Sequence, residues 1–241
     1  MTDFRQHLAG LLALPGAPQL SEKQLAQLAR HWQLLSAAAQ HFNLTAIAGD
    51  AEAAEKHYFD CLLALPALAG AAAGAQVADI GSGGGFPGLV LAVACPQLQF
   101  TLIEATGKKC AFLQDCCNQL GLANVRVLTM RAEEAGRAPD LRAAFAYATA
   151  RAVAPLAVLA EYALPLLRVG GRLVAFKGAN HAAEQAAASH ALQLLQAEAE
   201  APLLFTLPQS GEQRALLSIR KCGETPEKYP RRPGMPAKRP L

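Results

Sequence analysis

The stretch Asp-Ile-Gly-Ser-Gly-Gly-Gly-Phe-Pro-Gly, residues 79–88, follows a short apolar run and contains five glycines. Glycine lets a chain turn tightly and lets its backbone approach a ligand closely. A cluster of this kind is typical of the junction between a strand and a helix. We therefore expect a strand that ends at Ile80, a loop over residues 81–85, and a helix that begins at Gly88 with Pro87 in its first turn.

Strand and helix patterns alternate on the C-terminal side of this loop. We expect further strands at residues 100–104, 125–128, 144–149, 172–176, 203–207 and 214–220. We expect the helices between them at residues 108–120, 155–167 and 181–199, with Gly121 as a C-cap and Gly170-Gly171 as a turn. This alternation predicts a doubly wound, mostly parallel α/β sheet with helices on both faces. Such sheets bind their ligands at the carboxyl ends of the strands.

The first 70 residues have a helical pattern instead. Ser21 and Gln24 form a capping box, and apolar residues then recur at the spacing of one helix face. A second helix is expected from Ala51 to Leu65. We therefore divide the chain into an N-terminal helical subdomain at residues 1–70, an α/β domain at residues 71–221 and a basic C-terminal tail at residues 222–241.

Two cofactors compete for the glycine loop. Residues 83–88 fit the G-x-G-x-x-G fingerprint of dinucleotide-binding proteins, whereas residues 79–85 fit the acid-x-G-x-G-x-G pattern of methyltransferases. A carboxylate at Asp79 would repel a pyrophosphate, but it suits the sulfonium and amino groups of S-adenosylmethionine. The dinucleotide pattern would also begin two residues after the strand ends. We favour S-adenosylmethionine and keep a nicotinamide dinucleotide as the alternative.

Other residues at the ends of expected strands could complete a nucleoside pocket. Glu104 ends the second strand, where an acid can accept both ribose hydroxyls of either cofactor. Ala132 and Glu133 follow the third strand and could meet the adenine edge, although Glu133 alone would read as a solvated helix start. Arg151 follows the fourth strand among alanines, with no acid nearby in the sequence, so we expect it to face the cleft.

The composition favours a folded chain with one sizeable core. Of the 241 residues, 52% are hydrophobic and 17% are charged, which argues against disorder. The apolar stretches are too short and too interrupted to span a bilayer, and the first residues show no export signal. We therefore expect a cytoplasmic protein. The six cysteines form no C-x-x-C pair, which indicates buried free thiols and no metal site.

The positive charge is concentrated at the C-terminus. Seven basic and two acidic residues give residues 220–241 a net charge of +5, against −2 for the rest of the chain. A short basic tail on a nearly neutral body favours a polyanionic partner, usually nucleic acid. A solvated, unstructured end explains the same composition equally well.

Taken together, these features resemble the RsmG (GidB) family, bacterial methyltransferases of small-subunit ribosomal RNA. The glycine loop followed directly by Phe-Pro-Gly, combined with the tail, is far more specific than the loop alone. Met235 and Cys61 depart from residues that are frequent in the family, threonine and serine. The matching segments are residues 43–45, 55–57 with Asp60, 79–88, 107–109, 131–133, 150–152, 176–178 and 228–241.

The resemblance implies a class I methyltransferase that transfers a methyl group from S-adenosylmethionine to N7 of a guanine in a decoding-region loop of 16S rRNA. It implies cofactor contacts from Gly81, Phe86, Ala132, Glu133 and Arg151, to which the loop pattern adds Asp79, Gly83 and Glu104. It places Lys177, Asn43 and His57 on the substrate side. From their positions at strand ends, we expect Arg151 and Lys177 to help place the cofactor and the RNA, which makes them the candidates for catalysis. From their positions in the basic tail, we expect phosphate contacts from Lys228, Arg231, Arg232, Lys238 and Arg239.

Methylation at guanine N7 agrees with the residues that the sequence lacks. N7 has an in-plane lone pair and needs no general base, and the sequence shows no base–nucleophile dyad. Residues 150–153 read Ala-Arg-Ala-Val where amine methyltransferases carry an Asn/Asp-Pro-Pro-aromatic motif. Cytosine-C5 enzymes need a positioned cysteine, and we expect the one cysteine beside a proline, Cys95, to be buried.

The partner implied is 16S rRNA, either free or within the 30S subunit. The sequence contains no dimer signal, so we expect a monomer. The alternative outside the enzymes is a basic-tailed RNA-binding or ribosome-assembly factor with a vestigial pocket. Transfer of a labelled methyl group to RNA would separate these two hypotheses.

Overall fold

The computed structural model describes residues 3–41 and 43–241. Its strands are β1 Gln76–Ile80, β2 Gln99–Glu104, β3 Val125–Thr129, β4 Phe145–Arg151, β5 Leu167–Lys177, β6 Ala197–Ala199, β7 Leu203–Thr206 and β8 Gln213–Lys221. They form one sheet in the order β3-β2-β1-β4-β5-β8-β6, and β7 also pairs with β8. Strands β1 to β5 are parallel, and β8 runs antiparallel to β5, β6 and β7. The predicted doubly wound, mostly parallel sheet is confirmed.

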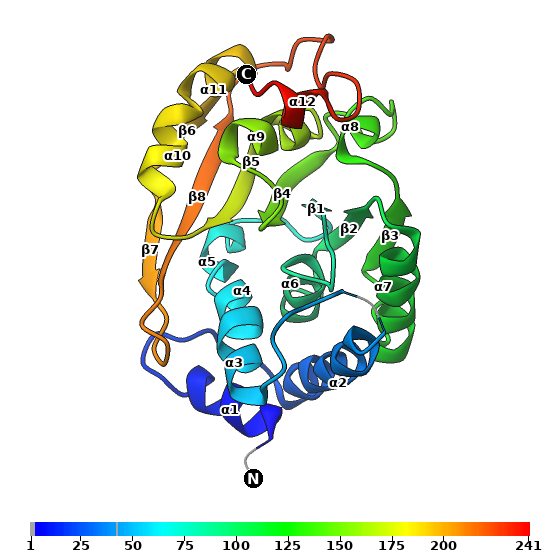
Figure 1. The fold of residues 1–241 in the computed structure, drawn as a ribbon, viewed down its shortest axis with the longest axis vertical. Helices are drawn as coiled ribbons and strands as arrows, with labels where there is room; N and C mark the ends of the chain where they lie inside the picture. Colours follow the sequence, from blue (N-terminus) through cyan, green and yellow to red (C-terminus); the bar gives the residue numbers. More distant parts are fainter. Residues whose placement is uncertain (1–2, 42) are drawn as a thin grey trace.

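The helices cover both faces of this sheet (Figure 1). The helices that precede β1 in the sequence are α1 Phe4–Leu12, α2 Glu22–Ala39, α3 Asp50–Ala53, η1 Ala54–Phe59, α4 Asp60–Leu62 and α5 Leu65–Leu68. The others are α6 Gly88–Ala94, α7 Gly107–Leu120, α8 Ala132–Ala135, α9 Leu156–Ala163, α10 His181–Ala187, α11 Ser189–Leu194 and α12 Met235–Lys238. Among the described residues, no helix is both long enough and apolar enough to cross a membrane.

Alternate residues of the strands enter two separate hydrophobic cores, as the two-residue repeat of a strand requires. Val77 and Phe100 pack into a core with the N-terminal helices and with α6 and α7. Ala78, Ile80 and Ile103 pack into the second core, with α9 and α11. The N-terminal helices therefore complete one face of the sheet and share its core.

Several elements match the sequence-based expectations closely. The Ser21 side chain accepts a hydrogen bond from the backbone of Gln24 at the start of α2, and the Gln24 side chain accepts one in return, which confirms the capping box. Helix α7 ends at Gly121, whose φ of +64° lies in the left-handed region. The loop at residues 81–85 leads from β1 into α6, which begins at Gly88 as predicted.

Other elements depart from the expectations. The single helix expected from Ala51 to Leu65 is interrupted by the π-helix η1, and the helix expected at 181–199 divides into α10, α11 and β6. The helix expected at 155–167 ends at Ala163, and β5 begins where that helix was expected to finish. In each case the local pattern predicted that a helix would form in this part of the chain. The residue at which the helix ends or changes type depends on tertiary packing.

The expected turn at Gly170-Gly171 is wrong, because both glycines lie inside β5. The pairing with β4 moves from Phe145–Leu167 directly to Tyr147–Arg172, so β5 bulges between these two pairs. Gly170 has a φ of +81°, and a Cβ on Gly171 would lie 2.9 Å from backbone oxygens. The glycines therefore permit a bulge, which their sequence signal does not distinguish from a turn.

The C-terminal tail is packed against the protein. Tyr229 is buried, and Figure 1 shows the tail crossing beside α8 and α9 before the short helix α12. Arg142 donates hydrogen bonds to the backbone carbonyls of Thr225 and Tyr229, both at 2.8 Å. The interpretation of this segment as a solvated, unstructured end is therefore wrong.

Candidate active site

Two pockets lie at the carboxyl ends of the parallel strands. The first, which we call the β1–β3 pocket, has a volume of about 280 Å³ and is lined by Gly81, Glu104, Ala132, Glu133 and Val153, among others. The second, the β4–β5 pocket, has a volume of about 480 Å³ and is lined by His57, Asp60, Arg151, Ala152, Lys177 and Glu184, among others. Because residues 151–153 contribute to both pockets, the loop after β4 separates them.

The glycine loop contributes Gly81 to the β1–β3 pocket. Gly81, Gly83 and Gly85 have φ values of +67°, +53° and +101°, in the region that residues with a Cβ rarely adopt. A Cβ on Gly81 would also lie 2.8 Å from a methyl group of Val153. Glycine at position 81 therefore lets the loop approach both the pocket and the segment after β4.

Glu104 binds the glycine loop and faces the same pocket. Its Oε2 accepts a hydrogen bond from the backbone N–H of Gly83 at 3.1 Å, and its Oε1 accepts one from Thr106 at 2.8 Å. A carboxylate oxygen has more than one lone pair, so both oxygens can accept a further donor. This geometry suits a ligand with two adjacent hydroxyl groups.

Ala132 and Glu133 begin α8 and line the opposite side of the β1–β3 pocket. The Glu133 side chain is buried, and its Oε1 accepts a hydrogen bond from the backbone N–H of Gly234 at 2.9 Å. Gly234 belongs to the C-terminal tail and itself lines the pocket, together with Ala237. The tail is therefore part of a pocket that the sequence assigned to strand ends alone.

Asp79 does not reach either pocket, contrary to the direct cofactor contact that the sequence predicted. The residue is fully buried, and its Oδ1 accepts a hydrogen bond from the Thr149 hydroxyl at 2.7 Å. A Cβ on Gly88 would lie 2.5 Å from the carboxyl group, which closes the space beside it. Burial raises the pKa of Asp79 to about 6. Asp79 supports the start of α6 and the loop from below.

Phe86 lies beneath the β4–β5 pocket, inside a cluster of aromatic rings. The His57 ring stacks on Phe86 with a centroid separation of 4.5 Å and an interplanar angle of 25°. The Arg151 guanidinium carbon lies 4.9 Å from the centre of the same ring. A cation at this distance from an aromatic face is attracted by the ring. Phe86 therefore links the glycine loop to the two side chains that face the second pocket.

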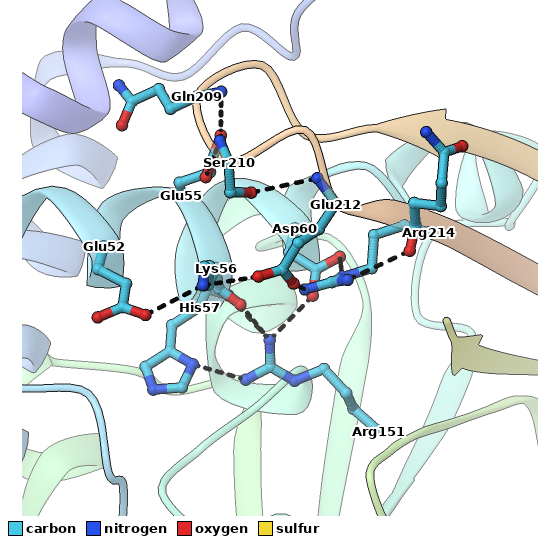
Figure 2. A network of polar contacts seen from close by, with 11 residues as sticks. Glu52, Glu55, Lys56, His57, Asp60, Arg151, Gln209, Ser210, Glu212 and Arg214 are labelled. Atoms are coloured by element: carbon cyan, nitrogen blue, oxygen red, sulfur yellow. Dashed lines mark hydrogen bonds and ion pairs between the residues drawn. The ribbon is translucent and has the colours of Figure 1, made fainter. Parts of the chain in front are cut away.

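Arg151 is held by the N-terminal helices, as Figure 2 shows. Its Nη1 donates to the backbone carbonyl of Lys56 at 2.8 Å and to Asp60 Oδ2 at 3.2 Å, and its Nη2 lies 3.2 Å from His57 Nδ1. Arg214, from β8, approaches the other oxygen of Asp60 at 3.5 Å. Arg151 therefore has an acidic partner, Asp60, although no acid lies near it in the sequence. The fold brings Asp60 to it from a distant helix.

His57 is neutral in this arrangement. Its Nε2 lies 2.6 Å from the Thr45 hydroxyl, and its Nδ1 faces the Arg151 guanidinium, which can only donate. Nδ1 is therefore the acceptor, and the ring proton lies on Nε2. Burial, reinforced by the positive charge of Arg151, lowers the pKa of His57 to about 3. His57 is a fixed ring in the wall of the pocket and does not ionise near neutral pH.

Lys177 lies at the end of β5, on the far side of the same pocket. Its Nζ pairs with Glu184 Oε2 at 2.5 Å and donates to the carbonyl of Ala154 at 2.9 Å. Glu184 also accepts a hydrogen bond from the backbone N–H of Leu156. Lys177 thus fixes the segment after β4 from one side, while Arg151 fixes it from the other.

The remaining predicted RNA contacts differ in their surroundings. Asn43 is exposed, as are Lys228, Arg232, Lys238 and Arg239 in the tail. Arg231 is different, because its guanidinium is paired with the buried carboxylate of Glu161, the closest contact being 2.6 Å. Arg231 therefore anchors the tail, and its predicted phosphate contact stays a prediction.

His31 is a residue of this region that the sequence did not single out. It is fully buried in α2, where its Nε2 lies 3.0 Å from the carbonyl oxygen of Gly84 and its Nδ1 lies 2.8 Å from the Tyr58 hydroxyl. Burial lowers its pKa to about 4, so the ring is neutral. A histidine on an apolar helix face gives no signal of this contact, since the glycine loop lies more than 50 residues away.

The cysteines are free thiols, and most of them are buried. Five cysteines are buried and only Cys222 is exposed, and all six are free thiols, which largely confirms the expectation. Within residues 3–41 and 43–241, no three His, Cys, Asp or Glu side chains come together in a way that could hold a metal ion.

Comparison with known proteins gives consistent matches along the chain. The sequence model of the GidB family, rRNA small subunit methyltransferase G, matches residues 24–216. The ribosomal RNA small subunit methyltransferase G of Pelotomaculum thermopropionicum is 43% identical over 222 residues, which is 92% of each chain. The protein of the same name from Limosilactobacillus fermentum is 41% identical over 245 residues, covering 99% of this chain and 97% of its own.

Solved structures share the fold at lower sequence identity. Cofactor-bound Rv0187 from MTB aligns with a TM-score of 0.58 at 23% identity, over 92% of this chain and all of its own. A 16S rRNA (adenine(1408)-N(1))-methyltransferase from Catenulisporales acidiphilia aligns with a TM-score of 0.52 at 12% identity, over 66% of this chain and 91% of its own. The family model and the relatives at 41–43% identity show more than a shared fold: the chain belongs to the rRNA small subunit methyltransferase G family.

Proposed function

We propose that the protein transfers a methyl group from S-adenosylmethionine to N7 of a guanine in a decoding-region loop of 16S rRNA. The observation that carries this proposal is the pair of adjacent pockets at the strand ends, separated by residues 151–153. Group transfer requires that the reacting atoms of a donor and an acceptor be held about 3–3.5 Å apart in the right orientation, and two adjacent pockets can bring a donor and an acceptor together. The membership of the family supports the choice of ribosomal RNA as the acceptor.

The residues of the β1–β3 pocket fit S-adenosylmethionine. Its volume of about 280 Å³ is close to the lower end of the range of about 300–1,000 Å³ that ligand pockets occupy. Glu104 would accept the ribose hydroxyls, and Ala132 and Glu133 would meet the adenine edge. Gly81 provides the close approach of the backbone. When bound, S-adenosylmethionine supplies an electrophilic methyl group on a positively charged sulfur.

The β4–β5 pocket would receive the guanine base. Four cationic and two acidic side chains line it: Lys56, Arg151, Lys177 and Arg214, with Asp60 and Glu184. Lys56 and Arg214 also pair with Glu212, which does not line the pocket, so the lining offers oriented N–H donors to the polar edges of a base rather than a large net charge. Pairing with Asp60 and Glu184 fixes Arg151 and Lys177 in position, so these cations can orient the base without a rearrangement.

The chemistry requires no proton transfer from the nucleophile. The in-plane lone pair of guanine N7 would form the new bond to the methyl carbon as the bond between that carbon and sulfur breaks, which leaves S-adenosylhomocysteine and a positively charged N7-methylguanine. The neutral, hydrogen-bonded His57 has no free nitrogen to act as a base, and none is needed. Catalysis then rests on alignment, to which Arg151 contributes through the Phe86 ring and Lys177 through the carbonyl of Ala154. Asp79 acts below the loop as a positioning residue. We further propose that the protein works as a monomer in the cytoplasm, where ribosomal subunits are found.

The test is transfer of labelled methyl groups by the purified protein to free 16S rRNA and to 30S particles, followed by nucleoside analysis. We expect N7-methylguanosine as the product, and the better of the two acceptors identifies the natural substrate. A titration with S-adenosylhomocysteine and NADH checks the cofactor separately, and only the former should bind. Label in another nucleoside, or in none, would contradict the proposal.

A further inference from the structure

The last ten residues of the tail have two kinds of surface. Gly234 and Ala237 line the β1–β3 pocket, and the backbone N–H of Gly234 donates to Glu133 at 2.9 Å. The neighbouring Arg232, Lys238 and Arg239 are exposed, and no described residue forms a hydrogen bond or an ion pair with their side chains. One short segment therefore carries both a wall of the pocket and three unpaired cations.

This segment is anchored at its beginning. The fully buried carboxylate of Glu161, on α9, accepts hydrogen bonds from the Arg231 backbone at 2.7 Å and from its guanidinium at 2.6–3.1 Å. Arg137 donates to the carbonyl of Pro230 at 2.8 Å. Charge-assisted, bidentate contacts of this kind are among the stronger interactions in proteins.

Beyond this anchor the contacts become sparse. Pro236 is buried and Leu241 packs against the second hydrophobic core, but residues 237–240 are exposed. Among the described residues, the hydrogen bond between Gly234 and Glu133 is the one polar contact that joins residues 232–241 to the pocket. The segment is therefore held weakly between its anchors and can respond to a ligand on either of its surfaces. Ordering by one ligand then reduces the entropic cost of binding the other.

We propose that residues 232–241 form a wall of the cofactor pocket that couples the binding of S-adenosylmethionine to the binding of RNA. The cofactor packs against Gly234 and Ala237, while RNA phosphates bind Arg232, Lys238 and Arg239 on the outer side. Each ligand favours the same docked position of the tail, so each strengthens the binding of the other by the same factor. This inference rests on the proposed function, since it assigns the β1–β3 pocket to the cofactor.

The first experiment measures the affinity of S-adenosylhomocysteine by calorimetry, without RNA. A variant that ends at Arg231 retains the anchor to Glu161 and loses the wall, and we expect it to bind at least 10-fold more weakly. Ala237→Trp fills the pocket from an exposed position and should have a similar effect in a folded protein. Glu227→Trp, a bulky change at an exposed tail residue that does not line the pocket, is the matched control and should leave the affinity unchanged.

The second experiment measures the coupling. We expect saturating 16S rRNA to raise the S-adenosylhomocysteine affinity of the full chain about 5-fold, a typical size for coupled sites. The triple variant Arg232→Gln, Lys238→Gln, Arg239→Gln should keep the affinity measured without RNA and lose this increase. Lys23→Gln with Arg168→Gln, at exposed cations elsewhere, should retain it. Hydrogen exchange of residues 232–241 should slow when either ligand is added to the full chain.

The outcomes distinguish a failure of the proposed function from a failure of the inference about the tail. If the full chain binds no S-adenosylhomocysteine, the proposed function fails. If the full chain binds it and both the truncated variant and Ala237→Trp bind equally well, the tail is not a wall and this inference is wrong. An RNA-induced increase that persists in the triple variant would overturn the coupling through the tail.

Discussion

In the β1–β3 pocket most polar groups come from positions next to a strand end, whereas the β4–β5 pocket collects its groups from distant segments. Glu104 ends β2, and Glu133 lies four residues beyond β3. Arg151 ends β4, but its partners Lys56, His57 and Asp60 belong to the N-terminal helices. The β1–β3 pocket is thus built largely from positions near strand ends, whereas the β4–β5 pocket depends on contacts between distant segments.

The β7–β8 hairpin shows how the second pocket depends on such contacts. Glu55, on η1, is buried and accepts hydrogen bonds from the backbone N–H groups of Gln209 and Ser210 (Figure 2). Lys56 pairs with Glu212 at 2.6 Å, and Arg214 reaches Asp60. The hairpin therefore holds the π-helix, which in turn holds Arg151.

The largest expected effect comes from a change that breaks the second pocket alone. Arg151→Lys keeps the charge but loses the planar fork that joins Lys56, Asp60 and His57. We expect the rate constant of methyl transfer to fall about 100-fold, because small errors in alignment cost that much. The affinity for S-adenosylhomocysteine should stay within a factor of two. An equal loss of cofactor affinity would show that the two pockets are not separate.

The reverse experiment is Glu104→Gln, which acts on the first pocket. An amide replaces one of the charged acceptors that face Gly83 and the ribose, and hydrogen bonds to charged groups contribute about 1.5–3 kcal/mol each. We expect S-adenosylhomocysteine to bind about 30-fold more weakly, with little change in the salt dependence of RNA binding. Glu198→Gln, at an exposed residue on β6, serves as the control in both titrations.

A smaller effect should follow from loosening the hairpin. In Glu55→Gln one carboxylate oxygen is replaced by an NH2 group, which opposes the backbone N–H of Ser210 or of Gln209 and leaves a single, uncharged oxygen to accept from both. We expect the free energy of unfolding in urea to fall by about 1.5 kcal/mol. Glu52→Gln changes an exposed member of the same helical segment, and an exposed ion pair contributes less than about 1 kcal/mol. Equal losses in both variants would exclude an anchoring role for Glu55.

The smallest expected effect is a dependence of the free energy of unfolding on pH. It comes from two buried histidines, His31 beside the glycine loop and His57 in the β4–β5 pocket. Burial lowers the pKa of His31 to about 4 and that of His57 to about 3, from 6.5 in the unfolded chain. The unfolded state therefore binds more protons below pH 6.5, so stability is present above this pH and is lost as the pH falls toward 4. Between pH 7.5 and 5.5 the contribution of His31 should fall by about 1 kcal/mol. His31→Gln should reduce the loss measured by urea unfolding, and an unchanged loss would contradict the buried, neutral ring.

The sequence predicted the elements that depend on local patterns. The capping box at Ser21, the C-cap at Gly121 and the glycine loop are each encoded within a few residues. The parallel sheet follows from the alternation of strand and helix patterns along the chain. The fold class could therefore be predicted almost completely. Of the residues that line the β1–β3 pocket, the sequence indicated Gly81, Glu104, Ala132 and Glu133, but not Gly234 and Ala237 of the tail. Nor did the pattern predict the packing that encloses Asp79, because it fixes only the place of this residue in the loop motif.

The rest depended on contacts between distant segments. The π-helix η1 includes a carbonyl that accepts a hydrogen bond from Arg151, 95 residues away in the chain, and no periodicity encodes this. The docking of the tail depends on the pairing of Arg231 with Glu161, which lies 70 residues earlier. A basic tail has the same composition whether it is free or packed, so the sequence could not distinguish the two.

The most direct test of the central claim is the mapping of N7-methylguanosine in 16S rRNA from cells that carry the gene, cells that lack it and cells that carry Arg151→Lys. We predict one methylated guanine in a decoding-region loop, present with the natural protein, absent without the gene and strongly reduced with the variant. Identical N7 methylation of that loop in all three strains would contradict the account.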